Sequence, residues 1–285
     1  MPKAKVSAVL AVLDFSYRER LTIRNLEIAF EHSELEILLV TADSSVQKED
    51  LPDSVTLLRD ERKGIHAAYN VGLRQATGDW IFFLGSGDQY VKRAGELLED
   101  LIKTNPDSRI MGFASTWVSW KPVSIQLGNT REDRPWDAGV LIFGLPVSHQ
   151  GIFCHREVFS ELGPLDPDLK TSSDFQFIAK AFKAGFHMAT SSQVIAVVDD
   201  GGVSSVRGDL VLHEHGEIVR ANFGLDSTID CEQIIRIGKG WVPTPQLAEL
   251  PSVLHESINA ARKYHGKRNP RRRFVIMLRG IVYAF

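Results

Sequence analysis

Runs of apolar residues with the length of strands alternate with helical stripes through the first hundred residues of the chain. Four apolar runs are continuous, as in strands covered on both faces, and they are residues 6–13, 35–40, 55–58 and 80–84. Apolar residues at every third or fourth position mark helices at residues 21–30, 65–76 and 94–101. This alternation predicts an α/β fold in which helices flank a mostly parallel central sheet.

The second half of the chain carries a less regular pattern. Its expected elements are a turn and strand at 146–155, a helix at 175–182, a strand at 194–198 and a helix at 247–264. Ser172 or Ser173 is expected to cap the first of these helices, and Gly185 follows its end. In the first half, Gly78 is expected to end the helix at 65–76.

Composition limits the class of protein and its partners. The chain has 285 residues, of which 44% are apolar and 24% charged, as in an ordinary globular protein. Cys154 and Cys231 form no Cys-x-x-Cys motif, so we expect two reduced thiols in a cytoplasmic protein and no structural zinc site. Setting aside the eight Lys and Arg residues of 262–285 leaves 25 basic and 36 acidic residues, a net charge of −11. This acidic body argues against nucleic acid as a partner.

The C-terminal segment has the opposite charge. Residues 262–285 contain no acid, and Arg271–Arg273 precede a twelve-residue apolar stretch that only Arg279 and Gly280 interrupt. Twelve residues are too few to span a bilayer as a helix, but they can lie in the interface of an anionic membrane. A terminal helix docked on the body of the protein is the alternative. Both interpretations stay open, and the first would make the protein peripheral at the inner face of the membrane.

Three sets of motifs resemble those of family 2 glycosyltransferases. The first is Lys63-Gly64-Ile65-His66-Ala67-Ala68-Tyr69-Asn70-Val71-Gly72 with Ala76-Thr77-Gly78-Asp79-Trp80, and the second is Phe83-Leu84-Gly85-Ser86-Gly87-Asp88. The third is His149-Gln150, Gly163-Pro164-Leu165-Asp166, Ser173-Asp174-Phe175 and Gly201-Gly202-Val203-Ser204. This last set is similar to the acceptor half of bacterial polysaccharide-building members. The order and spacing fit the family over about residues 5–205.

The resemblance implies a GT-A fold and a division of the chain. A glycosyltransferase domain is expected at 1–225, with a nucleotide-sugar half at about 1–105 and an acceptor half at about 106–225. A helical extension with the basic tail follows at 226–285. The implied reaction moves a sugar from a nucleotide-diphosphate sugar to a glycan or lipid-linked acceptor, with inversion, in surface polysaccharide biosynthesis.

Candidate donor residues cluster at the expected ligand edge of the sheet. Ligands of parallel sheets bind beyond the carboxyl ends of the strands, where residues 41–45 and 85–88 lie. Charge develops on the leaving diphosphate, and Mg²⁺ or Mn²⁺ can offset it, so Asp88 is the expected metal ligand. A plain tight turn is the alternative for residues 85–88. The expected donor-binding residues are Asp43, Lys63, Gly64, Asn70, Gly85, Ser86 and Gly87.

Inverting transfer also needs a base that takes the proton of the acceptor hydroxyl. The resemblance assigns this role to Asp174, and an acid that only interacts with its helix dipole is the alternative. His149 and Gln150 are expected to line the acceptor site, although a buried structural histidine is nearly as consistent with the pattern. Gly201 and Gly202 are expected in a phosphate-side loop.

The chain departs from the family pattern at several acidic positions. Thr41 stands where the family has an aspartate, which moves the carboxylate to Asp43, and Arg62, Ala67 and Gly87 replace three other acids. These losses keep open a degenerate GT-A protein that binds nucleotide or glycan without turnover. A nucleotidyltransferase is a further alternative, disfavoured because no Gly-rich basic loop follows the first strand.

One other histidine belongs to the first motif. His66 lies four residues before Asn70 and shares a helix face with it. We expect His66 on a solvated helix surface rather than in the donor site.

Overall fold

The computed structural model describes residues 3–118, 144–145, 147–199, 207–223, 230–232 and 235. The strands are β1 (Lys5–Val12), β2 (Glu34–Thr41), β3 (Val55–Arg59), β4 (Trp80–Leu84), β5 (Gln89–Tyr90), β6 (Ile110–Val118), β7 (Ile152–His155) and β8 (Met188–Asp199). The α-helices are α1 (Tyr17–Ala29), α2 (Ile65–Gln75), α3 (Ala94–Thr104), α5 (Arg156–Leu162), α6 (Ser173–Lys183) and α8 (Gly208–Phe223). Two short 3-10 helices are η1 (Lys48–Asp50) and η2 (His149–Gly151).

Across the described residues, eight strands form one sheet in the order β3-β2-β1-β4-β7-β6-β8-β5. β1 pairs in parallel with β2 and β4, β2 with β3, and β6 with β8. β7 runs antiparallel between β4 and β6, and the short β5 is antiparallel to β8. The expected α/β fold with a mostly parallel sheet is therefore confirmed, and the four apolar runs of the first hundred residues are β1 to β4.

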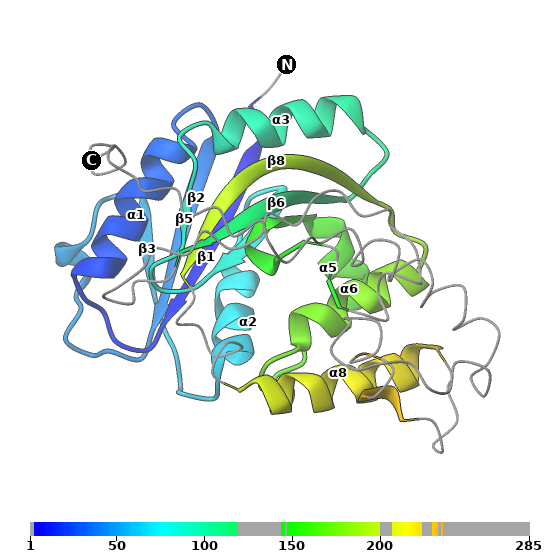
Figure 1. The fold of residues 1–285 in the computed structure, drawn as a ribbon. Helices are drawn as coiled ribbons and strands as arrows, with labels where there is room; N and C mark the ends of the chain where they lie inside the picture. The colour runs from blue at the N-terminus through cyan, green and yellow to red at the C-terminus, as the bar shows by residue number, and fades with distance from the viewer. Residues whose placement is uncertain are drawn as a thin grey trace.

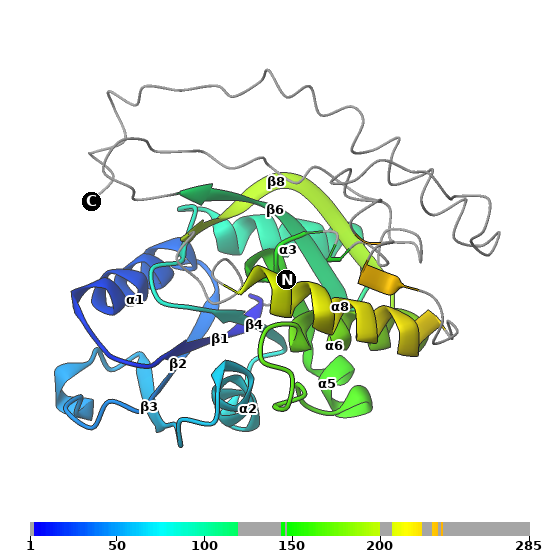
Figure 2. The ribbon, with the colours of Figure 1, turned by 60° about the horizontal axis from the view of Figure 1, so that its bottom comes forward.

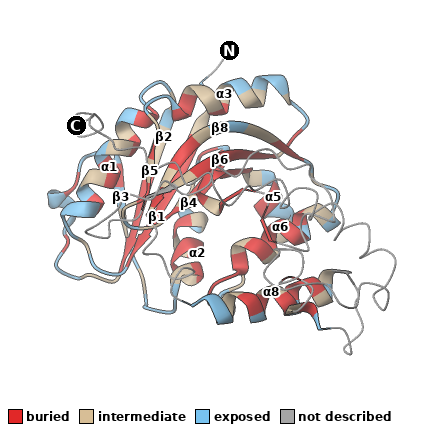
Figure 3. Ribbon diagram, in the orientation of Figure 1, coloured by how far each residue is buried: buried red, intermediate tan, exposed pale blue. Residues whose placement is uncertain are grey.

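Helices cover both faces of the sheet, which explains why its central strands are apolar throughout. Along β1, Ala8 and Leu10 face the core shared with α1 and α3, whereas Val9 and Ala11 face the core shared with α2, α5 and α6. Figures 1 and 2 show α3 on one side of the sheet and α2, α5 and α6 on the other. Buried residues are concentrated in the strands and on the inner helix faces (Figure 3).

Gly78 has a different role from the predicted one. Helix α2 ends at Gln75, and the Gly78 amide donates a hydrogen bond to the Ser7 hydroxyl at 2.8 Å. A Cβ at Gly78 would lie 2.7 Å from the amide nitrogen of Ser7. Its prediction as a helix end is therefore wrong, because close packing against β1 is what requires a glycine there.

The sequence pattern did not predict three elements of the second half, and it predicted a fourth element that is shorter than the one in the structure. β6, α5 and α8 were not expected, and β8 begins six residues before the predicted strand at 194–198. Polar residues interrupt the apolar pattern in β6 and at the start of β8, and two histidines and a glycine interrupt it in α8. Periodicity alone therefore gave too weak a signal in this half.

Some expectations lie outside the described residues. They are Gly201, Gly202, the helix at 247–264 and the basic apolar tail, so the domain boundaries stay a prediction. Both cysteines are described, and Cys154 and Cys231 are buried free thiols, as expected. Within the described ranges, no helix combines the length and the apolar character needed to cross a membrane.

Candidate active site

The carboxyl ends of β1, β2 and β4 lie at one edge of the sheet, because these strands pair in parallel. β4 ends at Leu84, and the chain then turns through residues 85–88. The turn puts the side chain of Asp88 into the protein, where the residue is only 4% exposed. A carboxylate this deeply buried at the ligand edge needs polar partners or a cation.

Three segments that are distant in the sequence meet at Asp88. Its Oδ2 accepts hydrogen bonds from the Gly85 amide at 2.9 Å and the Gln150 side chain at 3.3 Å. Its Oδ1 accepts one from the Asp199 amide, at the end of β8, at 3.1 Å. Burial raises the pKa of Asp88, although these hydrogen bonds and the nearby His149 oppose the rise. The cluster of β4, η2 and β8 residues thus holds a carboxylate whose negative charge a bound cation would stabilise.

The turn before Asp88 is tied to helix α1. The Ser86 hydroxyl donates a hydrogen bond to the carboxylate of Glu19, which also accepts from the amide and the hydroxyl of Ser16 at 2.6 Å each. Burial acts to raise the pKa of Glu19, but the hydrogen bonds from Ser16 and Ser86 bring it below its ordinary value. Gly87 has φ +84°, and it packs against the ion pair of Arg18 with Asp199. The two central residues of the turn are therefore both braced.

Sequence reasoning missed the part that Glu19 plays. Ser16 and Glu19 form a capping box at the start of α1, and that Ser-x-x-Glu spacing is readable in the sequence. The pattern could have located the helix start. It could not have indicated the contact with Ser86, which lies 67 positions along the chain.

A second pair of polar residues lies beside the Asp88 cluster. The Nδ1 atom of His149 is 3.6 Å from the Oδ2 atom of Asp174, and the two side chains are 30% and 28% exposed. The buried Tyr69 hydroxyl lies close enough to both carboxylates to interact with them. Burial is the main cause that raises the pKa of Tyr69, and the charges of Asp88 and Asp174 raise it further. The structure therefore brings Asp88, Gln150, His149 and Asp174 together, and Tyr69 is a neighbour that sequence reasoning did not single out.

Asp174 occupies the first turn of α6. Ser172 is at the N-cap position, as one of the two expected serines, but its side chain makes no capping hydrogen bond. The Oδ1 atom of Asp174 accepts a hydrogen bond from the Phe175 amide at 2.8 Å, and its Oδ2 atom faces His149. One carboxylate oxygen of Asp174 thus accepts a hydrogen bond from a backbone amide of the first helical turn, while the other oxygen points into the site.

The predicted solvent-facing surface of α2 is instead a packed one. His66 is 5% exposed, and its Nδ1 atom lies 2.8 Å from the Leu169 carbonyl oxygen. The Asn70 side chain donates to the Leu165 carbonyl at 2.7 Å and accepts from the Leu165 amide at 3.0 Å. The expectation of a solvated His66 is wrong, because this face of α2 holds the segment that leads to α6. Asn70, predicted to bind the donor, uses both ends of its amide in that contact.

Asp43, another predicted donor residue, bridges two loops at the ligand edge. It accepts hydrogen bonds from the Ser45 hydroxyl at 2.6 Å, the Ser45 amide at 2.9 Å and the Phe15 amide at 3.1 Å. The Ser45 hydroxyl first, then the two amides, lower the pKa of Asp43. Lys63 and Gly64 lie in the loop that opens α2, where Lys63 pairs with Glu61 and Gly64 has φ +106°. These residues border the ligand edge from the β2 side.

Two exposed apolar side chains follow β1 at the same edge. Leu13 is 55% exposed and Tyr17 is 72% exposed. Sequence reasoning did not select them. Leu13 lies directly after the end of β1 and before Asp14, and Tyr17 directly follows the helix cap at Ser16, so both positions were readable in the sequence.

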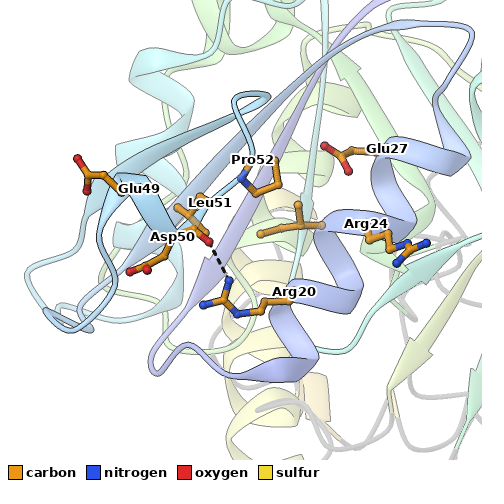
Figure 4. Close-up of a pocket in the computed structure, with 8 residues that line it drawn as sticks. Arg20, Arg24, Glu27, Glu49, Asp50, Leu51 and Pro52 are labelled. Atoms are coloured by element: carbon orange, nitrogen blue, oxygen red, sulfur yellow. Dashed lines mark hydrogen bonds between the residues drawn. The ribbon is translucent and has the colours of Figure 1, made fainter.

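A surface hollow of about 440 Å³ lies elsewhere, between α1 and the segment around η1 (Figure 4). Its lining residues are Arg20, Ile23, Arg24, Glu27, Glu49, Asp50, Leu51 and Pro52. None of them belongs to the Asp88 cluster or to the pair of His149 and Asp174. The hollow is therefore not part of the candidate active site.

Comparisons with known proteins agree with this architecture. The glycosyl transferase family 2 model matches residues 21–146. A "PGL/p-HBAD biosynthesis glycosyltransferase" of Mycobacterium bovis is 26% identical over 137 residues, which are 47% of this chain and 49% of that protein. An uncharacterized glycosyltransferase of Haemophilus influenzae is 24% identical over 162 residues, or 52% of each chain. The chain thus spans about half the length of the curated relatives it matches.

Solved structures share the fold at low sequence identity. S. aureus TarS 1-349 in complex with UDP-GlcNAc superposes with a TM-score of 0.62 and 15% identity, over 93% of this chain and 74% of that one. A second TarS crystal structure gives a TM-score of 0.58 and 17% identity, over 92% and 53%. The motifs, the matched segment and the GT-A-like sheet with its flanking helices agree, and they support a similarity of this chain to glycosyltransferase family 2.

Proposed function

We propose that this protein transfers a sugar from a nucleotide-diphosphate sugar to a glycan or lipid-linked acceptor, with inversion at the anomeric carbon. The proposal includes assistance by Mg²⁺ or Mn²⁺ and a role in the assembly of bacterial surface polysaccharide. The observation that carries it is the convergence of Asp88, Gln150, His149 and Asp174 at the ligand edge of the sheet. The UDP-GlcNAc complex of TarS, which has the same fold, supports a nucleotide-sugar as the donor.

The residues at Asp88 fit a divalent cation held jointly with a diphosphate. Among the described residues, no three metal-ligating side chains gather as a closed cage. Mg²⁺ in nucleotide sites needs no such cage, since one or two carboxylates and the phosphates themselves supply its ligands. Asp88 is one carboxylate, and the carboxylate of Asp199 lies beside Gly87. When bound, the cation would offset charge that develops on the leaving diphosphate.

The remaining roles follow from position and protonation. The carboxylate of Asp174 takes the proton of the acceptor hydroxyl as that oxygen attacks the anomeric carbon. His149 and Gln150 lie between Asp174 and Asp88 and would orient the acceptor against the donor sugar. Leu13 and Tyr17 offer apolar surface to the nucleotide base at the same sheet edge.

The donor half of this proposal is tested at Asp88. Thermal shifts are measured with UDP-, GDP- and dTDP-sugars, beginning with UDP-GlcNAc, with and without Mn²⁺. A ligand at 100 times its Kd should stabilise the wild type by about 2.7 kcal/mol. The Asp88→Asn variant should lose the part of the thermal shift that depends on Mn²⁺. The control variant Asp100→Asn, whose residue is on the exposed face of α3, should keep that part. An unchanged Mn²⁺-dependent shift in Asp88→Asn would exclude the metal assignment.

The catalytic half is tested at Asp174. Asp174→Asn should lower kcat by about 10²- to 10⁴-fold, the usual contribution of a general base, while donor affinity stays nearly unchanged. Asp209→Asn is the matched control, because Asp209 is also an acid in the first turn of a helix. Equal, near-normal kcat values for both variants would mean that Asp174 only stabilises its helix.

A binder without turnover remains the alternative class, because several family acids are replaced in this chain. It predicts a thermal shift with a nucleotide-sugar but no release of nucleoside diphosphate, either to water or to added glycans. Release of UDP, GDP or dTDP that disappears in Asp174→Asn would rule out that alternative.

A further inference from the structure

Helix α8 carries a buried carboxylate that contacts the segment leading to Asp174. Glu214 is 7% exposed, and α8 lies beside α6 in Figures 1 and 2. Its Oε1 atom accepts a hydrogen bond from the Lys170 amide at 2.8 Å. Its Oε2 atom accepts from the Thr171 amide at 3.0 Å and the Thr171 hydroxyl at 2.7 Å. A single side chain thus holds two consecutive residues that end three positions before Asp174.

Glu214 makes these contacts as a carboxylate. Burial acts to raise the pKa of Glu214, but the hydrogen bonds from the Thr171 hydroxyl and from the amides of Lys170 and Thr171 bring it below its ordinary value. Hydrogen bonds to a charged acceptor are shorter and stronger than neutral ones. The negative charge also lies near the start of α6, where the helix dipole favours it.

The helix that carries Asp174 depends on this contact because its own cap is weak. Ser172 is fully buried at the N-cap position, yet its side chain makes no capping hydrogen bond. The residue after Glu214 supports the other side of Asp174, since the ring of His215 packs on Phe175 with centroids 4.3 Å apart. α8 therefore contacts the chain both before and after Asp174.

We propose that Glu214 is a positioning residue that sets the start of α6 and thereby directs the Asp174 carboxylate toward the acceptor. This inference rests on the proposed role of Asp174 as the base. A base must be held close to its productive geometry, and a displacement of about 1 Å can lower a rate by roughly 10²-fold. Glu214 touches neither the donor cluster around Asp88 nor the pair of His149 and Asp174 directly, so its effect should appear in kcat and not in donor binding.

Glu214→Gln is the first test, because it keeps the size of the side chain but sets an NH₂ group against a donor at Lys170 or Thr171. The assay is release of nucleoside diphosphate from the nucleotide-sugar that the wild type turns over fastest. We expect kcat to fall by about 10- to 100-fold, with KM for the donor unchanged. Glu217→Gln is the matched control on the same helix, since Glu217 is 61% exposed and pairs with neighbouring Arg220.

A double-mutant cycle identifies the route of the effect. If Glu214 acts through Asp174, adding Glu214→Gln to Asp174→Asn should lower kcat no further. An equal further loss in that background would overturn the proposal, as would a kcat in Glu214→Gln that matches Glu217→Gln. Normal kcat in Asp174→Asn itself would instead refute the base assignment, which keeps the two failures distinct.

Two milder variants cover the case in which Glu214→Gln does not fold. Thr171→Val removes one hydroxyl donor and leaves the carboxylate, so it should lower kcat severalfold, and Thr171→Ser should restore it. Hydrogen exchange at the Phe175 and Gln176 amides should be faster in Thr171→Val than in Thr171→Ser. Equal kcat and equal exchange in the two variants would overturn the proposal.

Discussion

Substitution of Gly87 by alanine tests whether the turn before Asp88 is braced as the structure indicates. Gly87 has φ +84°, a conformation that costs a residue with a Cβ about 1–2 kcal/mol. The new Cβ would also overlap the Arg18 guanidinium and lie 2.9 Å from the Asp199 carboxylate. Arg18 is 55% exposed and can move away, so losing its ion pair adds less than about 1 kcal/mol. The expected loss of unfolding free energy is about 1–3 kcal/mol.

Two glycines of the same chain separate strain from contact. Gly185 has φ +88° and nothing within 4 Å of its Cβ position, so Gly185→Ala measures the backbone strain alone. Gly85 has no positive φ, and its Cβ would be 3.6 Å from the Asp88 carboxylate, so Gly85→Ala should change stability little. Urea unfolding of the three variants gives the free energies.

The functional readout distinguishes Gly87 from the strain control. Movement of Asp199 should disturb its amide hydrogen bond to Asp88, which spans 3.1 Å. Gly87→Ala should therefore weaken Mn²⁺-dependent binding of UDP-GlcNAc in calorimetric titration, whereas Gly185→Ala should not. Equal stability loss and equal donor binding in these two variants would refute the reasoning, because only the contact with Arg18 and Asp199 differs between them.

Three further predictions concern other parts of the chain. Asn70→Ala should lower the unfolding free energy by about 1–3 kcal/mol, because it leaves the buried amide and carbonyl of Leu165 without the side-chain partner; an unchanged urea midpoint would contradict this. Glu214 has a folded-state pKa below its ordinary value of 4.5, so its stabilising contribution is present at neutral pH and is lost as the pH falls through the folded pKa. Melting temperature should thus fall less steeply with acid in Glu214→Gln than in Glu217→Gln, and parallel curves would disprove the linkage. Protein ending at residue 265 should no longer pellet with anionic liposomes, and undiminished pelleting would exclude the tail as a membrane contact.

The first half of the fold was predictable from local sequence. β1, β2 and β4 are largely buried on both faces, so most of their residues are apolar and the runs are visible without any knowledge of their partners. Parallel pairing of such strands implies that their carboxyl ends share one ligand edge. Residues 85–88 follow the end of such a strand, so their place at this edge could be predicted without knowing any contact. The motif containing Asp88 and the one containing Asp174 were also readable, since each lies within a few consecutive residues.

The second half depended on contacts that local pattern does not encode. β7 enters the sheet antiparallel between β4 and β6, and polar residues in β6 mask its strand period. α8 went unrecognised because its apolar stripe is interrupted, although it supplies Glu214 to the start of α6. The contact of Asn70 with Leu165 was equally invisible, because a buried amide and a ligand-binding amide look the same in the sequence until the partner is known.

The alternating strands and helices, the ligand edge of the sheet and the residue types available there can be read from the amino-acid order alone. Which of those residues meet depends on how the folded chain packs. Two of the hydrogen bonds on Asp88 come from Gln150, 62 positions away, and from Asp199, 111 positions away, while Asp174 reaches the same site from a separate helix. The periodicity of apolar residues shows which face of a helix or strand is buried, because the residues of that face recur at fixed spacing within the element itself. The pairing of polar groups depends on how distant elements pack, and that information exists only when the whole chain has folded.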